Sequence, residues 1–386
     1  MVIGAIIIGI WALTLAMGFV EGFTKSYLDN AINYQYAHLQ LHAEGYQANN
    51  DPELYLPEGL QMTSGIQAAE GVEAVTARTV VQGMVASAQT ASGVQVFGIN
   101  PEAEQEVFRV HETMQEGTFL AGEGRNPVVI GTDLAEKLHV DLRSKIVLTF
   151  TDTEGNLISG AFRVAGIFNT RSPVLNQAAA FVRRSDLARL LGKEDMIHEI
   201  TLRAENPETL ETLKQKLQQA YPGVEVQTWQ DLAPELELIS SQTSTSLIVL
   251  LVIIMLALGF GIVNTMLMSV LERVKELGML MAVGMHKRKV FFMIILETMM
   301  ISLVGGPLGL LAGYATVRYF QQNGLDLSNY AQGLDQFGYA SVLRPELSPE
   351  HYLLMTLGVV ITAILGSVYP AYKAIRLKPV EALSKL

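Results

Sequence analysis

The chain contains 386 residues, of which 49% are hydrophobic and 17% are charged, and its formal net charge at pH 7 is −11. Soluble domains carry about 25% charged residues, so this composition argues against a protein that is water-soluble throughout. The sequence contains no cysteine, which excludes disulfide bonds, thiol nucleophiles, thiolate zinc sites and iron–sulfur clusters.

Four apolar stretches are long enough to cross a bilayer as helices, which requires about 20 residues each. The predicted transmembrane helices lie at 1–21, 241–271, 290–318 and 352–372. No basic residue precedes the first stretch and no small-residue cleavage motif follows it. We therefore expect it to be a retained helix and not a cleaved signal peptide.

The distribution of basic residues predicts the orientation in the membrane. Lys and Arg gather in the segment 272–289 and in the tail 373–386, which are therefore expected to be cytoplasmic. The short, acidic loop 319–351 is expected on the outer side, and with four spans the acidic region 22–240 lies there too. The predicted fold class is an α-helical membrane protein with four transmembrane helices and a large α+β extracytoplasmic domain inserted between helices 1 and 2. This acidic charge does not favour a nucleic-acid partner.

The outer domain shows strand and helix signals in turn. A strand is predicted at 36–42, a hairpin at 145–164 around an Asp-Thr-Glu-Gly-Asn turn, and a β-α-β unit at 197–229 with a helix capped by Asn206. The segment 230–246 is expected to be a helical stalk that continues into the second transmembrane helix.

Two histidines, His38 and His42, lie four residues apart, a spacing that would suit a metal ion on a helix. Their surroundings alternate with a period of two residues, which favours the exposed face of a strand. We therefore predict no metal site here.

Motifs for several catalytic chemistries are missing. The sequence has no G-x-x-x-x-G-K-[ST] loop, no H-E-x-x-H, no G-x-S-x-G and no dinucleotide-binding fingerprint. No catalytic residue, cofactor or metal ligand is therefore predicted. ATP hydrolysis, if the chain depends on it, is expected in a partner subunit.

Polar and helix-bending residues occur within the predicted spans. Glu297 is favoured as a structural carboxyl facing the helix bundle over a proton relay, because the spans contain no second ionisable group at that depth. Asn264 and Thr265 are expected to form hydrogen bonds between helices. The run Gly305-Gly306-Pro307 predicts a kink, for which a moving joint and close helix packing remain equal alternatives.

The sequence around the end of the second span is distinctive. It reads Asn264-Thr-Met-Leu-Met-Ser-Val-Leu-Glu-Arg-Val-Lys-Glu-Leu-Gly-Met-Leu-Met-Ala-Val-Gly284, and is followed by Glu297, by Gly305-Gly-Pro-Leu-Gly309 and by Tyr369-Pro370-Ala371 leading to Leu377-Lys-Pro-Val-Glu-Ala-Leu383. Together with the order of spans, these motifs resemble FtsX-like permeases, the membrane subunits of ABC transporters of the MacB and LolC/LolE type, with a MacB-like periplasmic core domain. MacB proteins carry their ATPase in the same polypeptide and none is present here, so the arrangement is more similar to LolC/LolE with a separate ATPase.

The resemblance implies that the segment 272–289, with the end of the preceding span, is a coupling element that contacts the ATPase. Its pattern of apolar and charged residues suits a short amphipathic helix in a partner's groove, and the alternative is an ordinary turn at the membrane surface. The implied ATPase-coupling residues are Val270, Glu272, Arg273, Lys275, Glu276, Leu277, Gly278, Ala282 and Gly284. The implied structural or hinge positions in the membrane are Asn264, Glu297, Gly305, Gly306, Pro307 and Pro370.

The resemblance also implies a function. The chain is expected to be the permease subunit of a bacterial inner-membrane ABC transporter, paired with a second permease subunit and a separate ATPase, whose motion it would transmit to its periplasmic domain. Release of a lipoprotein or another amphipathic substrate is favoured, with a periplasmic adaptor or acceptor and membrane lipids as further partners. Export of peptides or macrolide-like drugs, and a non-transporting FtsX-type regulator of cell-wall hydrolases, are the alternatives.

Overall fold

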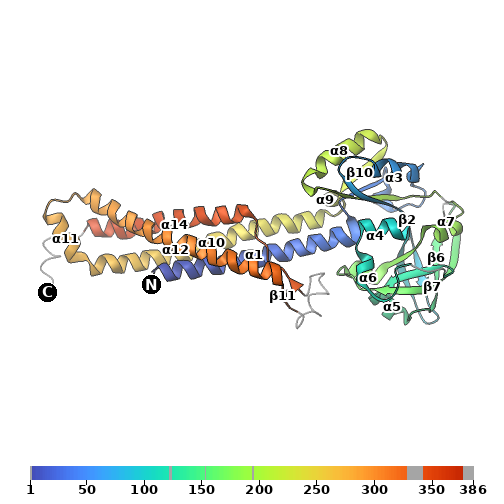
Figure 1. Ribbon diagram of the computed structural model, residues 1–386, viewed down its shortest axis with the longest axis horizontal. Coiled ribbons are helices and arrows are strands. Elements are labelled where there is room, and N and C mark those ends of the chain that lie inside the picture. The colour runs from blue at the N-terminus through green and yellow to red at the C-terminus, as the bar shows by residue number, and fades with distance from the viewer. Residues whose placement is uncertain (1, 121–123, 153, 194, 328–341, 377–386) are drawn as a thin grey trace. The chain divides into compact units, whose positions relative to one another are not determined.

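The computed structural model describes residues 2–120, 124–152, 154–193, 195–327 and 342–376. The chain forms two compact units (Figure 1). Residues 26–237 make up an outer unit of strands and helices, and the chain before and after them makes up a helical unit.

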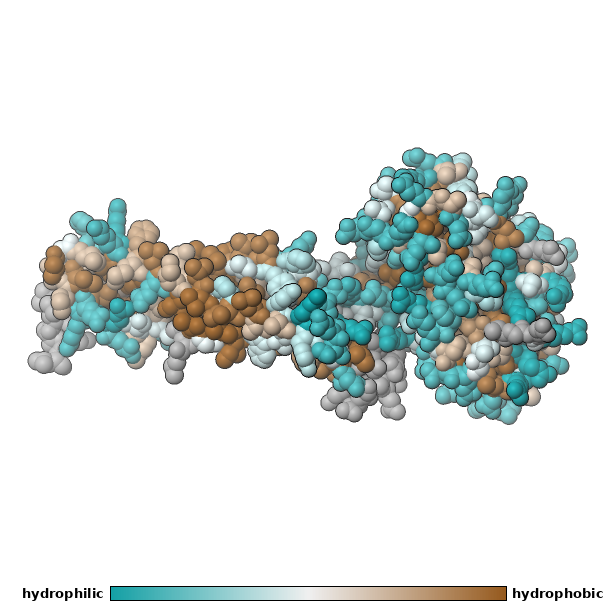
Figure 2. All heavy atoms as spheres, viewed as in Figure 1, coloured by the Kyte–Doolittle hydropathy of each residue, from teal (hydrophilic) through white to brown (hydrophobic). Residues whose placement is uncertain are grey.

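Four long helices build the helical unit. They are α1 (Val2–Ala31), α10 (Pro234–Glu272), α12 (Lys287–Asn323) and α14 (Pro349–Ile375), and each is long and apolar enough to cross a membrane. The four predicted spans are thus confirmed, although the helices extend beyond them. Figure 2 shows hydrophobic residues gathered over the middle of these helices, where lipid would contact them.

Shorter elements complete this unit. Helix α11 (Val274–Ala282) lies between α10 and α12, and the antiparallel strands β11 (Leu325–Asp326) and β12 (Val342–Leu343) lie between α12 and α14. The part of the predicted tail that carries Leu377, Pro379, Glu381 and Leu383 lies outside the described residues.

Glycines let α12 pack closely against α1. Gly305, Gly309 and Gly313 recur every four residues on one buried face of α12. A Cβ atom built on Gly313 would lie 2.6 Å from Thr14 Cβ, and one on Gly309 would lie 2.9 Å from Ile7 O. Lipid provides no hydrophobic force between helices, so such close contacts stabilise the pair instead. In the predicted run itself, Cβ atoms on Gly305 and Gly306 would lie 3.1 Å from Ile6 Cγ2 and 3.2 Å from Val359 Cγ1, which supports the close-packing alternative, and α12 is continuous through Pro307.

The outer unit contains one sheet with the strand order β10-β1-β9-β2-β3-β8-β5-β7-β4, with β6 paired to β2 and β7. The strands are β1 (Leu39–Ala43), β2 (Val72–Ala86), β3 (Ala91–Ile99), β4 (Met114–Gly117), β5 (Pro127–Gly131), β6 (Lys145–Thr151), β7 (Leu157–Phe168), β8 (Ala179–Arg183), β9 (Glu199–Ala204) and β10 (Val224–Thr228). Its helices are α2 (Tyr46–Asn49), α3 (Gly59–Gln67), α4 (Pro101–Val107), α5 (Thr132–Leu138), α6 (Pro173–Ala178), α7 (Arg184–Leu191), α8 (Leu210–Ala220) and α9 (Trp229–Leu232).

Strand β2 divides this sheet into two halves. Residues 72–78 pair with β9, and residues 79–86 pair with β3 and partly with β6. In the second half, the successive residues Val80 and Val81 point to opposite faces of the sheet and belong to different hydrophobic clusters. Both faces of the sheet are therefore covered. A third cluster fills the half formed by β1, β9, β10 and the start of β2.

Most of the predicted outer elements are confirmed. The hairpin is the antiparallel pair β6 and β7, and the β-α-β unit is β9, α8 and β10, with β1 between its two strands. The Asn206 side chain accepts a hydrogen bond from Glu208 N, as expected for a cap. The predicted stalk consists of α9 and the start of α10, separated at Ala233.

The prediction for His42 is wrong, because its side chain is fully buried and not on an exposed strand face. Tyr46 of α2 stacks on the imidazole ring with centroids 5.3 Å apart, and Tyr46 also stacks with His198 at a centroid distance of 5.6 Å. Both faces of β1 are thus covered. Burial lowers the pKa of His42, so the ring is neutral in the folded chain at pH 7.

A buried ion network at the middle of β2 joins β2 and β9 to helix α4. The Arg78 guanidinium pairs with Glu104 of α4 and, at 3.0 Å, with Glu199 of β9. Thr76 donates to Glu104 and Thr201 donates to Glu199, each from a buried hydroxyl group. Burial alone would lower the pKa of Arg78, but the two carboxylates outweigh it and raise that pKa, so the guanidinium stays charged.

We expect Arg78→Met to lower the free energy of unfolding of the outer unit by about 3–5 kcal/mol, because two buried carboxylates lose their counter-ion. Guanidinium chloride unfolding of the full chain in lipid nanodiscs measures this, followed by the fluorescence of Trp229 in a Trp11→Phe background. The control is Lys216→Met, which removes an exposed pair with Glu70 and should cost about 1 kcal/mol or less. Equal losses in both variants would contradict the prediction.

A second prediction concerns the α1–α12 contact. Gly309→Ala should lower the free energy of unfolding by about 1–3 kcal/mol, because its methyl group overlaps the backbone of α1. Gly261→Ala on α10 is the matched control, since a Cβ there meets nothing within 4 Å. Unfolding in mixed micelles with increasing sodium dodecyl sulfate, followed by circular dichroism, should separate the two variants. A neutral Gly309→Ala would disprove close packing at this position.

Candidate functional site

The candidate site is α11, the short helix between two membrane helices. Helix α10 ends at Glu272, and Arg273 breaks the helical conformation before α11 begins at Val274. At the other end, Gly284 has a φ of +106°, a conformation that favours glycine, and it turns the chain towards α12. The sequence thus places a break on each side of a nine-residue helix and isolates one amphipathic segment.

Helix α11 has a buried and an exposed apolar face. Leu277 and Gly278 are buried, and Leu277 packs in the core of the helical unit. On the other side, the Met279 side chain is 57% exposed and Val283, just after the helix, is 85% exposed. Exposed apolar side chains beside charged ones are typical of a docking surface.

The predicted coupling residues lie together but play different parts. Val270, Leu277 and Gly278 are buried, so they hold α11 to the helical unit. Exposed positions are Glu272, Arg273, Lys275, Glu276, Ala282 and Gly284. Sequence reasoning missed Met279 and Val283. Their spacing of four residues, on the side opposite Leu277, is a signal that could have found them.

Glu297 of α12 does not face the interior of the bundle. Its side chain is 38% exposed, and its Oε1 accepts a hydrogen bond from Arg273 Nη1 at 2.9 Å. Arg273 Nε also donates to Glu276 Oε2 at 3.0 Å. The hydrogen bond to Glu276, followed by the charge of Glu297, raises the pKa of Arg273. The predicted intramembrane carboxyl is therefore joined to the candidate site.

The other predicted membrane positions are spread over three helices. Thr265 Oγ1 donates to Gly261 O of its own helix, so it does not form the expected bond between helices. Asn264 is exposed, and its expected interhelical bond stays a prediction. Gly305 and Gly306 are buried, Pro307 is exposed within α12, and Pro370 is buried within α14.

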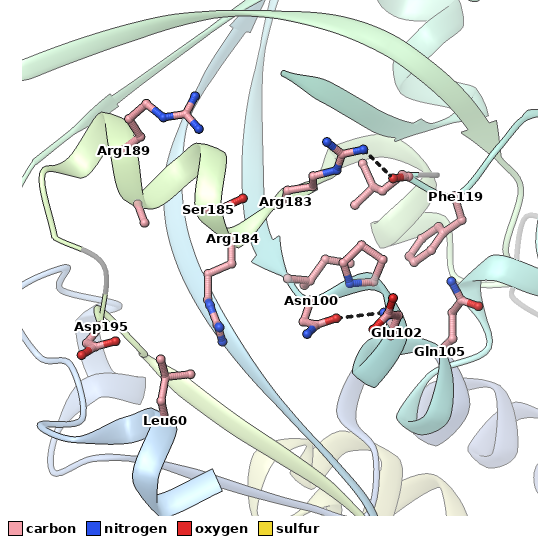
Figure 3. A pocket seen from close by; sticks show the side chains of 14 residues that line it. Leu60, Asn100, Glu102, Gln105, Phe119, Arg183, Arg184, Ser185, Arg189 and Asp195 are labelled. Carbon is pink, nitrogen blue, oxygen red and sulfur yellow. Dashed lines mark hydrogen bonds between the residues drawn. The ribbon is translucent and has the colours of Figure 1, made fainter. Parts of the chain in front are cut away.

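The outer unit contains a second candidate site, a cavity of about 850 Å³. Figure 3 shows Arg183, Arg184 and Arg189 along one side of it. Arg183 Nη2 donates to Leu120 O at 3.2 Å, and burial lowers the pKa of Arg184. The volume is in the range of small-molecule sites. Acidic side chains also line the cavity, so its charge selects no single ligand class.

Two family models cover most of the chain. Residues 248–379 match the model described as FtsX-like permease C-terminal, and residues 1–220 match the MacB-like periplasmic core domain. The described part of the first match contains α11, α12 and α14 with most of α10.

Individual relatives have low identity. The chain is 26% identical over 289 residues to the macrolide export ATP-binding/permease protein MacB of Nitrobacter winogradskyi, a match that covers 70% of this chain but only 41% of that protein. It is 23% identical over 403 residues to the lipoprotein-releasing system transmembrane protein LolC of Neisseria meningitidis, which covers 99% of this chain and 92% of that protein. The periplasmic region of MacB from Actinobacillus actinomycetemcomitans superposes with a TM-score of 0.39 at 11% identity, over 55% of this chain and 97% of that structure.

Proposed function

The chain belongs to the FtsX-like permease family of ABC transporters, of the MacB and LolC type, and from this premise we propose that it transmits the motion of a separate cytoplasmic ATPase to its periplasmic domain. Four apolar helices and a MacB-like periplasmic core domain fit an inner-membrane protein with a large periplasmic domain. The observation that carries the proposal is α11, a short helix with an exposed apolar face between two membrane helices.

Helix α11 suits the role of a docking element for three reasons. It lies between α10 and α12 in a segment whose basic residues predict a cytoplasmic location. Met279 and Val283 present apolar surface that a groove on a partner would cover. Leu277 and Gly278 are buried on the opposite side, so a displacement of α11 is passed to the membrane helices through packed contacts.

Helix α10 suits the role of a lever. Its 39 residues form one continuous helix of about 58 Å at a rise of 1.5 Å per residue. A bilayer needs only about 20 of them, so the helix continues well outside the hydrocarbon region. In the proposed mechanism, tilting its cytoplasmic end moves its outer end by a comparable amount, because an unbroken helix resists bending.

For the substrate we favour a lipoprotein or another amphipathic molecule. The support is the relative named as a lipoprotein-releasing transmembrane protein, whose match covers nearly the whole of both chains. Export of a macrolide-like compound is the second candidate, supported by the relative named as a macrolide exporter, to which the chain is similar over part of its length. We also propose that ATP hydrolysis resides in a partner and that a second permease subunit, identical or related, completes the complex.

The docking role of α11 predicts the effect of Met279→Asp combined with Val283→Asp. Two carboxylates on the exposed apolar face should abolish binding of the ATPase, because they cannot be desolvated in an apolar groove. Vanadate-sensitive ATPase activity that co-purifies with the tagged chain from the native membrane should fall at least tenfold, which corresponds to about 1.4 kcal/mol or more.

The matched control is Val174→Asp in the outer unit, where the side chain is 63% exposed and no ATPase is expected to dock. This variant should keep the full co-purifying activity. The proposal fails if the α11 double variant retains the ATPase as well as the control does, or if the unchanged chain binds no ATPase.

A further inference from the structure

Arg273 lies where three helices meet. It is the single residue between the end of α10 and the start of α11, and its guanidinium reaches Glu276 on α11 and Glu297 on α12. Glu297 is 24 residues away in sequence, so this contact is not a local feature of the turn. The side chain therefore ties α12 to both neighbouring elements at once.

The geometry uses the planar fork of arginine. Nε lies 3.0 Å from Glu276 Oε2 and Nη1 lies 2.9 Å from Glu297 Oε1, so different nitrogens serve different carboxylates. A guanidinium holds its donors in a fixed arrangement, whereas an ammonium group presents a single point charge on a flexible stem. Once both carboxylates are bound, their separation is restricted.

Because of the surroundings of Glu297, losing its ion pair costs more free energy than losing a pair in water. The residue lies eight positions beyond Lys289, or about 12 Å along α12 from the basic residues expected at the membrane surface. Its neighbours on α12, such as Leu296 and Met300, are apolar and exposed to the surroundings of the helix. A carboxylate at such a position is costly unless it is paired, so loss of Arg273 would leave an unfavourable charge.

We propose that Glu276, Arg273 and Glu297 form a bridge that positions α11 against α12, and that this bridge transmits displacement of α11 to α12. The inference rests on the proposed function, since it assigns the connection through which the docked element would move a membrane helix. In this role Arg273 and Glu297 are positioning residues. They hold the docking face of α11 in place.

The position of α11 can be measured on the full chain without any partner. Because the sequence contains no cysteine, spin labels at Lys275→Cys on α11 and Met300→Cys on α12 are the only ones introduced. In lipid nanodiscs, double electron–electron resonance should give a narrow distribution of the distance between the two labels when the bridge is unchanged. Arg273→Gln or Glu297→Gln should broaden it, while Lys373→Gln, an exposed cation on α14, should leave it unchanged.

Transmission is measured in the complex with the ATPase, by the ATP-driven change in fluorescence of a label at Leu238→Cys, near the outer end of α10. Arg273→Gln and Glu297→Gln should each keep the bound ATPase. In each variant the ATP-driven fluorescence change should be roughly five- to tenfold smaller, as expected for strongly coupled charged neighbours.

The double variant Arg273→Gln with Glu297→Gln separates positioning from simple neutralisation. It leaves no unpaired charge at position 297, and Glu276, which also loses Arg273, has an exposed side chain. A pair that only neutralises Glu297 therefore predicts full recovery of the ATP-driven change. The bridge predicts that the change stays low. Recovery in this variant, or a narrow distance distribution in both single variants, would overturn the inference while leaving the proposed function intact. Because the distance measurement needs no ATPase, it judges the bridge even if the proposed function fails.

Discussion

The lipid environment imposes the constraint on which the helical unit depends. A backbone N–H or C=O group in hydrocarbon must find its partner within the protein, so the chain can break its helices only near the membrane surface. The two breaks around α11 fall beside the basic residues expected there, and α12 continues through Pro307 without interruption. With no hydrophobic force to hold helices together in lipid, the glycine face of α12 supplies the contact with α1.

The same environment explains which parts of the fold could be predicted. Apolar length alone identified the four spans, but it could not locate the helix ends, because α1 continues to Ala31 through residues that are no longer apolar. The hairpin of β6 and β7 was predictable since its strands alternate and its turn residues are local. The burial of His42 was not, because it depends on Tyr46 packing over a face that the strand pattern leaves open.

The candidate site divides in the same way. The position of α11 and most of its residues could be expected from sequence, since charged and apolar residues alternate there with a helical period. The partner of Glu297 could not, because Arg273 lies on the far side of a turn and a helix start, and periodicity describes only one element at a time. Met279 and Val283 could have been predicted from their spacing of four residues, although the sequence analysis did not identify them as part of the exposed face.

Strand β2 has a mechanical consequence for the outer unit. Its 15 residues belong to both halves of the sheet, and the Arg78 network lies where the pairing changes from one half to the other. Two parts joined only by a loop could move independently, but the two halves of this sheet share β2 and cannot do so without breaking its backbone hydrogen bonds. A force applied to one half of the sheet would therefore be transmitted directly to the other half.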